Sequence, residues 1–150
     1  MIQVLFKDYF VVLQVYSQSQ QPWKTKMAND ASNFLPVMLE SPYSGDLLLN
    51  FSYWKAANLH SIFEMHEAPI SSHFYYTQFL NDKDPSQREL GITLGYALAQ
   101  RAKKVVFYMD LGESRGMLAA RKRVMRAGLP FEQRYLGIDW EKYLTRGLSA

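Results

Sequence analysis

The sequence predicts an α/β fold, a three-layer sandwich in which helices cover both faces of a mostly parallel sheet. From residue 36 onward, short apolar segments of strand length alternate with segments of helix length, and turn residues separate them. Strands that alternate with helices in this way pair in parallel through right-handed crossovers. The length of 150 residues suits one domain of this kind and requires no second one.

Residues 1–35 are expected to lie outside this domain, as an N-terminal β extension followed by a linker. Apolar side chains nearly alternate along residues 1–19, which predicts one or two strands. Residues 18–34 are polar, contain Pro22 and show no apolar period, so they predict an exposed loop. The α/β domain itself is expected to span residues 36–150.

The domain begins with a strand and a helix. Residues 36–40, "PVMLE", predict a short apolar strand, and residues 46–65 have the length and spacing of a helix with Asp46 as its N-cap. Large apolar side chains of this helix fall on one broad face, which we expect to be buried: Leu48, Phe51, Trp54, Leu59 and Ile62.

The middle of the domain repeats this order. Residues 67–73 predict a second short extended segment, whereas residues 74–80 fit no single element. The next helix, residues 84–102, has Asp84 as its N-cap and Pro85 at the first helical position, where a missing N–H group costs nothing. The helix contains the small-residue stretch "LGITLGYALA", which indicates close helix packing and requires no cofactor.

The last part of the domain contains the clearest strand. Residues 103–110, "KKVVFYMD", are an apolar run that an aspartate closes. A helix over residues 114–128 follows, which begins at a serine that can cap it and ends at a glycine. Residues 129–136 predict one more strand, and residues 139–148 predict a short closing helix.

Composition narrows the possible chemistry. The apolar content of 48% and the charged content of 21% are typical of a folded globular protein, and the net charge of +3 suits an anionic small molecule about as well as weak nucleic-acid contact. The absence of cysteine excludes disulfides, thiolate nucleophiles and cysteine-ligated metal sites. Because the three histidines are spaced unlike a helical zinc pair, we expect no metal, and we expect no cofactor.

Neither a membrane nor a nucleic acid is expected as a partner. No segment reaches the roughly 18 uninterrupted apolar residues of a spanning helix, and Lys7 and Asp8 interrupt the apolar N-terminus. We therefore expect a soluble, cytoplasmic protein. The basic run at residues 120–126 has a helical spacing that is typical of a solvated helix face, and nucleic-acid binding requires a wider patch with stacking aromatics.

Polar residues follow three of the predicted strands at the points where those strands end. In parallel sheets, ligands bind at the carboxyl ends of the strands, where the loops leave. The candidate site residues form three groups: Glu40, Ser41, Tyr43 and Gly45; Ser72 and His73; and Asp110, Gly112, Glu113, Ser114, Arg115, Gly116 and Met117. We expect the three groups to converge at one edge of the sheet.

Two of these residues are acidic and end apolar strands. A single acid at a strand end is ordinary, because such ends are exposed to solvent, but Glu40 and Asp110 at equivalent edges favour a function. If their strands are neighbours, the two carboxylates reach one ligand as nucleophile, general base or acceptor for a ribose hydroxyl. The loop "DLGESRGM" adds a helix N-terminus and Arg115, a candidate phosphate or carboxylate site that also fits an ordinary helix start capped by Ser114.

Four stretches taken together carry a family resemblance. "LESPYSGD", "EAPISSHFYYTQ", "RELGITLGYA" and "VVFYMDLGESRGM", in this order, resemble conserved phage proteins related to nucleoside 2-deoxyribosyltransferases, over residues 36 to about 136. The resemblance implies a flavodoxin-like, Rossmann-like sheet of strand order 2-1-3-4-5 and a nucleoside or nucleotide ligand at its carboxyl edge. It also implies a homodimer or larger homo-oligomer, in the host cytoplasm if the protein is phage-encoded.

The same resemblance implies a reaction. In the wider family a glutamate attacks C1′ of a deoxyribosyl group, the base leaves, and water or a second base takes the sugar; related members hydrolyse deoxynucleoside monophosphates. The family's nucleophilic glutamate corresponds to Leu118 in this chain, and the superficially similar stretch "LGITLGYA" has Thr93 where a glutamate would stand. The chain therefore departs from the family at the reacting residue.

Two interpretations follow from this departure. In the first, another carboxylate performs the reaction, and the candidates are Glu40, Glu113 and Asp110. In the second, the protein binds a nucleotide without cleaving it. We favour Glu40 as nucleophile or base, Asp110 as the residue that holds the sugar, and the helix start at residues 114–117 as the phosphate site. The function classes are thus an N-glycosidase or deoxyribosyltransferase, a non-catalytic binder of a nucleotide or signal molecule, and a phage–host interaction protein.

Overall fold

The computed structural model describes residues 31–145, and Phe34–Leu144 forms one compact unit within it. The predicted N-terminal strands and most of the predicted linker lie outside the described residues. The last residues of that linker form a single 3-10 turn, η1 (Ala31–Asn33). The compact unit thus begins two residues before the expected start of the domain at residue 36.

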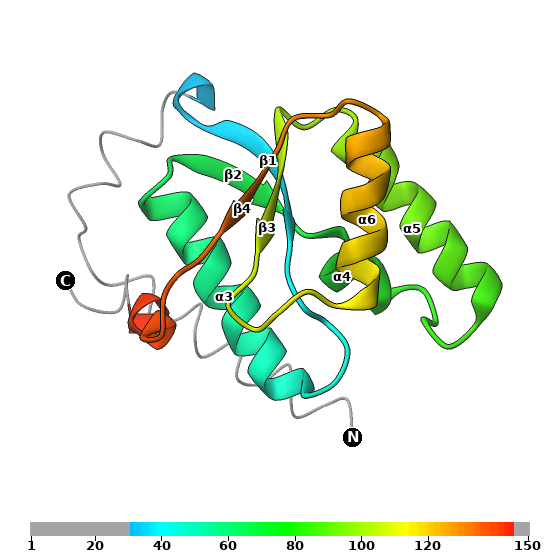
Figure 1. The fold of residues 1–150 in the computed structure, drawn as a ribbon, viewed down its shortest axis with the longest axis horizontal. Helices are drawn as coiled ribbons and strands as arrows, with labels where there is room; N and C mark the ends of the chain where they lie inside the picture. Colours follow the sequence, from blue (N-terminus) through cyan, green and yellow to red (C-terminus); the bar gives the residue numbers. More distant parts are fainter. Residues whose placement is uncertain (1–30, 146–150) are drawn as a thin grey trace. The chain divides into compact units, whose positions relative to one another are not determined.

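A four-stranded, all-parallel sheet forms the centre of the unit (Figure 1). Its strands are β1 (Leu35–Glu40), β2 (Glu67–Ile70), β3 (Lys104–Tyr108) and β4 (Phe131–Arg134), in the order β2-β1-β3-β4. This confirms the predicted α/β class and the order that the resemblance implies for these four strands. The described residues contain no fifth strand.

Helices cover both faces of the sheet, which gives the predicted three layers (Figure 1). Helix α3 (Leu47–Phe63) packs on one face, and α5 (Pro85–Ala99) and α6 (Arg115–Arg126) pack on the other. Because side chains alternate along a strand, Val37 and Leu39 point to α3, whereas Met38 between them points to α5 and α6. This alternation decides which strand-end residues share a face.

The helices begin where the sequence predicts. The carboxylate of Asp46 accepts two backbone N–H groups in the first turn of α3, and the carboxylate of Asp84 does the same for α5. The hydroxyl of Ser114 caps α6 through the backbone N–H of Met117. These caps fix the positions at which the chain leaves the carboxyl edge of the sheet.

Short helices occupy the segments that the sequence leaves ambiguous. Residues 74–78 fall within α4 (Ser72–Tyr75) and η2 (Tyr76–Gln78), and the closing helix is the 3-10 element η3 (Trp140–Thr145). A Cβ atom at Gly95 would lie 2.5 Å from the Ser72 hydroxyl oxygen, so the close packing of α4 on α5 requires this glycine. Within residues 31–145, no helix is both long enough and apolar enough to span a bilayer.

The buried face of α3 differs from the predicted one. The side chains that face the sheet are small or polar: Asn50, Tyr53, Ala56, Ala57 and Ser61. The predicted face was wrong, since Leu48 is 81% exposed and Phe51 is exposed too. Ala56 and Ala57 pack in the same apolar cluster as the strand residues Val37 and Leu39, and hydrogen bonds from Tyr53 and Ser61 add to this contact.

A buried ion-pair network ties β2 to β4 on the α3 face. Arg134 donates two hydrogen bonds of 2.7 Å to the Glu67 carboxylate, and Lys104 lies 3.0 Å from it. Burial raises the pKa of Glu67, but the bonds from Arg134, Ser61 and Lys104 outweigh burial and lower it to about 2. Glu67 is therefore ionised at neutral pH, and its charge is fully compensated.

Candidate functional site

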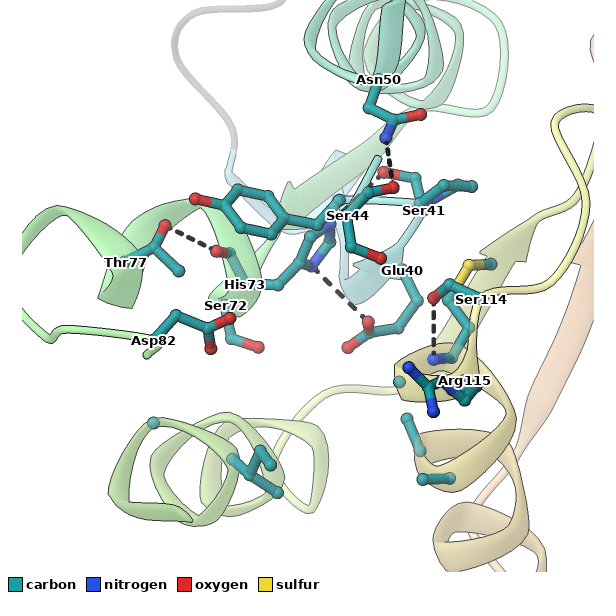
Figure 2. Close-up of a pocket in the computed structure, with 18 of the residues that line it drawn as sticks. Glu40, Ser41, Ser44, Asn50, Ser72, His73, Thr77, Asp82, Ser114 and Arg115 are labelled. Atoms are coloured by element: carbon teal, nitrogen blue, oxygen red, sulfur yellow. Dashed lines mark hydrogen bonds and ion pairs between the residues drawn. The ribbon is translucent and has the colours of Figure 1, made fainter. Parts of the chain in front are cut away.

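A cavity of about 1200 Å³ opens at the carboxyl edge of the sheet (Figure 2). Its walls are the loops after β1 and β3 together with α4, α5 and α6. Most of the candidate residues line it: Glu40, Ser41, Tyr43, Ser72, His73, Gly112, Glu113, Ser114, Arg115, Gly116 and Met117. The structure thus brings together residues from all three predicted groups.

Glu40 enters the cavity because of its place in β1. It lies two residues after Met38 and therefore points to the same face, toward α5 and α6. Its side chain is only 16% exposed, and this burial raises the pKa of the carboxyl group to about 7. Near neutral pH, Glu40 is present in both protonation states, which suits a nucleophile or a general acid–base group.

His73 connects Glu40 to Ser41. Its Nδ1 lies 3.5 Å from the Glu40 carboxylate, and its Nε2 lies 3.3 Å from the Ser41 hydroxyl oxygen (Figure 2). Burial lowers the pKa of His73 to about 4, so the ring is neutral at pH 7. The Glu40 contact is long, and within the described part of the chain Nδ1 has no hydrogen-bond partner.

This arrangement accommodates both protonation states of Glu40. When Glu40 is ionised, the proton of the neutral ring lies on Nδ1 and faces the carboxylate, and the Ser41 hydroxyl donates to Nε2. When Glu40 is protonated, its O–H faces Nδ1, and Nε2–H donates to Ser41. A shift of the imidazole tautomer therefore follows each proton that Glu40 gains or loses.

The start of α6 forms the wall opposite His73 (Figure 2). The loop that leads to it turns at Gly112, whose φ of +85° favours glycine, and Ser114 caps the helix. The backbone N–H groups of Arg115 and Gly116 lie in the first turn, where a helix offers no internal acceptor. With the Arg115 guanidinium beside them, these groups can bind a phosphate.

Glu113 lines the cavity but is occupied by a neighbour. Arg121 donates to both of its carboxylate oxygens, at 2.6 and 3.0 Å. This bidentate pair holds the pKa of Glu113 below its usual value, so Glu113 is an anion that a helical arginine neutralises. Of Glu40 and Glu113, only Glu40 has a pKa near neutral pH.

Asp110 does not reach the cavity, contrary to our expectation that it holds the sugar. It lies two residues after Tyr108, which packs in the α3 cluster, and its carboxylate lies on that side of the sheet. There it accepts the backbone N–H groups of Leu136 and Gly137, at 2.9 and 2.8 Å, and the hydroxyl of Tyr53. Asp110 therefore fixes the chain after β4.

Two further positions lie outside the cavity wall. Gly45 turns the chain before α3 at a φ of +103° and does not line the cavity, although we expected it to bind the ligand. Leu118, the position to which the sequence resemblance assigns a glutamate nucleophile, is half-buried on α6 and does not line the cavity either.

The predicted site residue Tyr43 is in edge-to-face contact with Phe74, their ring centroids 5.1 Å apart, and provides an aromatic wall of the cavity. Two other lining residues escaped the sequence analysis. On α5 and α6, Tyr96 and Arg123 line the far end of the cavity, although the run containing Arg123 was expected to be a solvated face. The helical spacing of Arg115 and Arg123 places both on the cavity side of α6, which is the signal that could have identified them.

Among residues 31–145, no group of three or more histidine or acidic side chains could hold a metal ion.

Comparison with known proteins identifies a family. A model described as a domain of unknown function, DUF7768, matches residues 36–134, which include every residue of the cavity wall. Neither a curated protein nor a solved structure matches the chain. Because the match covers more than half of the sequence, the chain belongs to the DUF7768 family.

Proposed function

We propose that the protein acts on the N-glycosidic bond of a deoxynucleoside or its 5′-monophosphate, as an N-glycosidase or deoxyribosyltransferase-like enzyme. The observation that carries the proposal is Glu40: a buried carboxyl group with a pKa of about 7, in a large cavity, opposite a helix start that can bind phosphate. Kinship to nucleoside 2-deoxyribosyltransferases, which the sequence motifs suggest, is part of this proposal.

In the proposed reaction Glu40 is the nucleophile. A carboxylate oxygen attacks C1′, the C1′–N bond breaks, and its electron pair leaves with the base, which takes up a proton from solvent water. Water or a second base then attacks C1′, and the bond between C1′ and the Glu40 oxygen breaks. In the hydrolytic case, the proton of the attacking water passes to the Glu40 carboxylate that this step releases, whose pKa of about 7 allows it to hold the proton.

The other walls supply the binding contacts. The α6 start, with Arg115 and Gly116, takes the 5′-phosphate, because unpaired backbone N–H groups and a guanidinium both favour an anion there. Tyr43, half-buried between Phe74 and the cavity, offers its ring to the base. Figure 2 shows the Glu40 side chain between His73 and the start of α6, and in the proposed complex C1′ of the nucleotide lies next to its carboxylate.

Release of free base tests the proposal. The wild-type protein is incubated with the four deoxynucleosides, their 5′-monophosphates and the matching ribonucleotides, and free base is quantified by chromatography. We expect base release from a deoxy substrate, its loss in Glu40→Gln and its retention in Glu113→Gln, since Arg121 already neutralises Glu113. Release that survives Glu40→Gln would refute the assignment of the nucleophile.

A second candidate function is nucleotide or signal-molecule binding without cleavage. The observation that favours it is Leu118, an apolar side chain at the position where nucleoside 2-deoxyribosyltransferases have their nucleophilic glutamate. This alternative predicts saturable binding of a nucleotide, measured by calorimetry, with no base released and with no effect of Glu40→Gln beyond affinity.

A further inference from the structure

The cavity is larger than one nucleotide requires. Its volume of about 1200 Å³ exceeds the range of about 300 to 1,000 Å³ that suffices for ordinary small-molecule ligands. The wall follows α6 from Arg115 to Arg123, a rise of about 12 Å at about 1.5 Å per residue. If the 5′-phosphate binds at the start of α6, most of this length lies beyond it.

The far end of the cavity has its own binding groups. The Arg123 guanidinium lies 5.5 Å from the centroid of the Tyr96 ring, and both side chains line the cavity. A second hollow, of about 460 Å³, shares these two residues and adds Lys122 and Arg126. An aromatic ring and a group of cations therefore lie together between α5 and α6.

The charges of the cavity are distributed unevenly. Salt bridges pair Arg121 with Glu113, and Arg88 with Asp82. Over residues 31–145, no such ion pair involves Arg115 or Arg123, although both line the cavity. Arg115 and Arg123 thus lie at the two ends of the α6 wall without an acidic partner among the described residues. A ligand with two separate negative charges would pair with both of them.

Part of the wall between the two ends is made of small side chains. Gly91 and Ala99 on α5 and Ala119 and Ala120 on α6 all line the cavity, together with the larger Ile92 and Met117. One cavity includes both Arg115 and Arg123 in its wall. The cavity is thus one continuous site with two charged ends.

We propose that the ligand is a 5′-phosphorylated dinucleotide, with one nucleoside at Glu40, the linking phosphate at the start of α6, and the second nucleoside and its 5′-phosphate at Tyr96 and Arg123. This proposal rests on the proposed function, because it takes Glu40 as the place of the first nucleoside. The second base stacks on Tyr96 or on the guanidinium plane of Arg123, and the terminal phosphate pairs with Arg123.

Calorimetry with Glu40→Gln protein tests the proposal without turnover. The probes are matched pairs for each of the four bases, a deoxynucleoside 5′-monophosphate and the corresponding 5′-phosphorylated dinucleotide. We expect at least one dinucleotide to bind about tenfold or more tightly than its monophosphate, because it adds a charge-assisted contact and a stacked base. The double variant Glu40→Gln, Arg123→Gln should bind the dinucleotide no more tightly than the monophosphate, and its affinity for the monophosphate should be unchanged.

Two further variants serve as controls. Arg123→Lys retains the charge and should keep most of the advantage. Lys122→Gln removes the same charge from an exposed residue that lines only the second hollow, and it should leave the tenfold difference in place. A dinucleotide advantage that persists in Arg123→Gln, or an equal loss for both probes, would refute the far site.

The outcomes separate this proposal from the proposed function. Equal affinities of monophosphate and dinucleotide would refute the dinucleotide, whether or not wild type releases base. Tight dinucleotide binding that depends on Arg123, without base release by wild type, would support the ligand and refute the reaction. A hexanucleotide that binds more than about tenfold tighter than the dinucleotide would place contacts outside the cavity and would also contradict the proposal. If no probe binds, the dinucleotide is refuted, and base release by wild type alone decides the proposed function.

Discussion

The substitution Glu40→Gln should make the stability of the protein depend on pH in a predictable way. A carboxyl group with a pKa of about 7 in the folded protein and 4.5 in the unfolded chain stays protonated longer in the folded state. Its contribution to stability is therefore complete below pH 4.5 and is lost as the pH rises through 7. Glutamine, which resembles the neutral acid, does not lose this contribution.

The magnitude follows from the two pKa values. One pKa unit corresponds to about 1.4 kcal/mol, so ionised Glu40 costs the folded state about 3 kcal/mol at pH 8 and about 1 kcal/mol at pH 5.5. The difference in unfolding free energy between Glu40→Gln and wild type should accordingly rise by about 2 kcal/mol between these pH values. Effects of the substitution that do not depend on pH cancel in this comparison.

The assay is urea unfolding followed by tryptophan fluorescence at pH 5.5, 7 and 8. Glu113→Gln is the control, because Arg121 lowers the pKa of Glu113 and both the folded and the unfolded states are ionised above pH 5.5. Its effect should change little over this range. A Glu40→Gln effect that is flat with pH, or that falls as the pH rises, would refute the buried, half-protonated carboxyl group and indicate a charged pair with His73.

Three further predictions concern residues around the site and the sheet. Burial lowers the pKa of His73 to about 4, so the stability that its neutral ring contributes is present above pH 6.5 and is lost as the pH falls. The difference in unfolding free energy between His73→Asn and wild type should therefore rise by about 2 kcal/mol from pH 7 to pH 4.5 in the same unfolding assay. Asp110→Asn should lose about 1 to 3 kcal/mol, because an amide cannot accept every hydrogen bond that the carboxylate accepts, while ligand affinity stays unchanged; a large loss of affinity would return Asp110 to the site. Glu67→Gln should lose about 3 to 5 kcal/mol, because it leaves the charge of Arg134, a side chain only 7% exposed, without its main partner; a loss below about 1 kcal/mol would contradict the burial of this pair.

Much of the fold could be predicted from local features of the sequence. Capping residues such as Asp46 and Ser114 mark helix starts, because their side chains accept N–H groups that the helix leaves unpaired. Apolar strands such as residues 103–110 are recognisable because a parallel strand that is covered on both faces is apolar throughout. The convergence of polar residues at one edge of the sheet follows from parallel pairing alone.

The errors arose where long-range contacts decide. The buried face of α3 was predicted from its large apolar residues, but Tyr53 reaches Asp110 across the sheet, and the helix turns its small and polar side toward the strands. Asp110 was placed in the site because it ends a strand as Glu40 does. The pairing of Glu40 with Phe107 puts the two acids on opposite faces, and strand register is not readable from the sequence.

The place of Arg123 in the cavity wall could not be predicted from the composition of its helix. A run of four basic residues on one helix is usually a solvated face, and the sequence offers no sign that Tyr96 lies opposite it. Only the packing of α5 beside α6 creates the cavity end that these two residues line.

The most direct test of the central claim is to locate the sugar on the protein during turnover. Wild-type protein is mixed with a deoxynucleoside 5′-monophosphate that it cleaves, quenched with acid within one turnover, digested and mapped by mass spectrometry. The account predicts a deoxyribosyl phosphate on the peptide that contains Glu40, absent from Glu40→Gln. A sugar attached to Glu113 or to any other carboxylate, or base release with no adduct on Glu40, would contradict it.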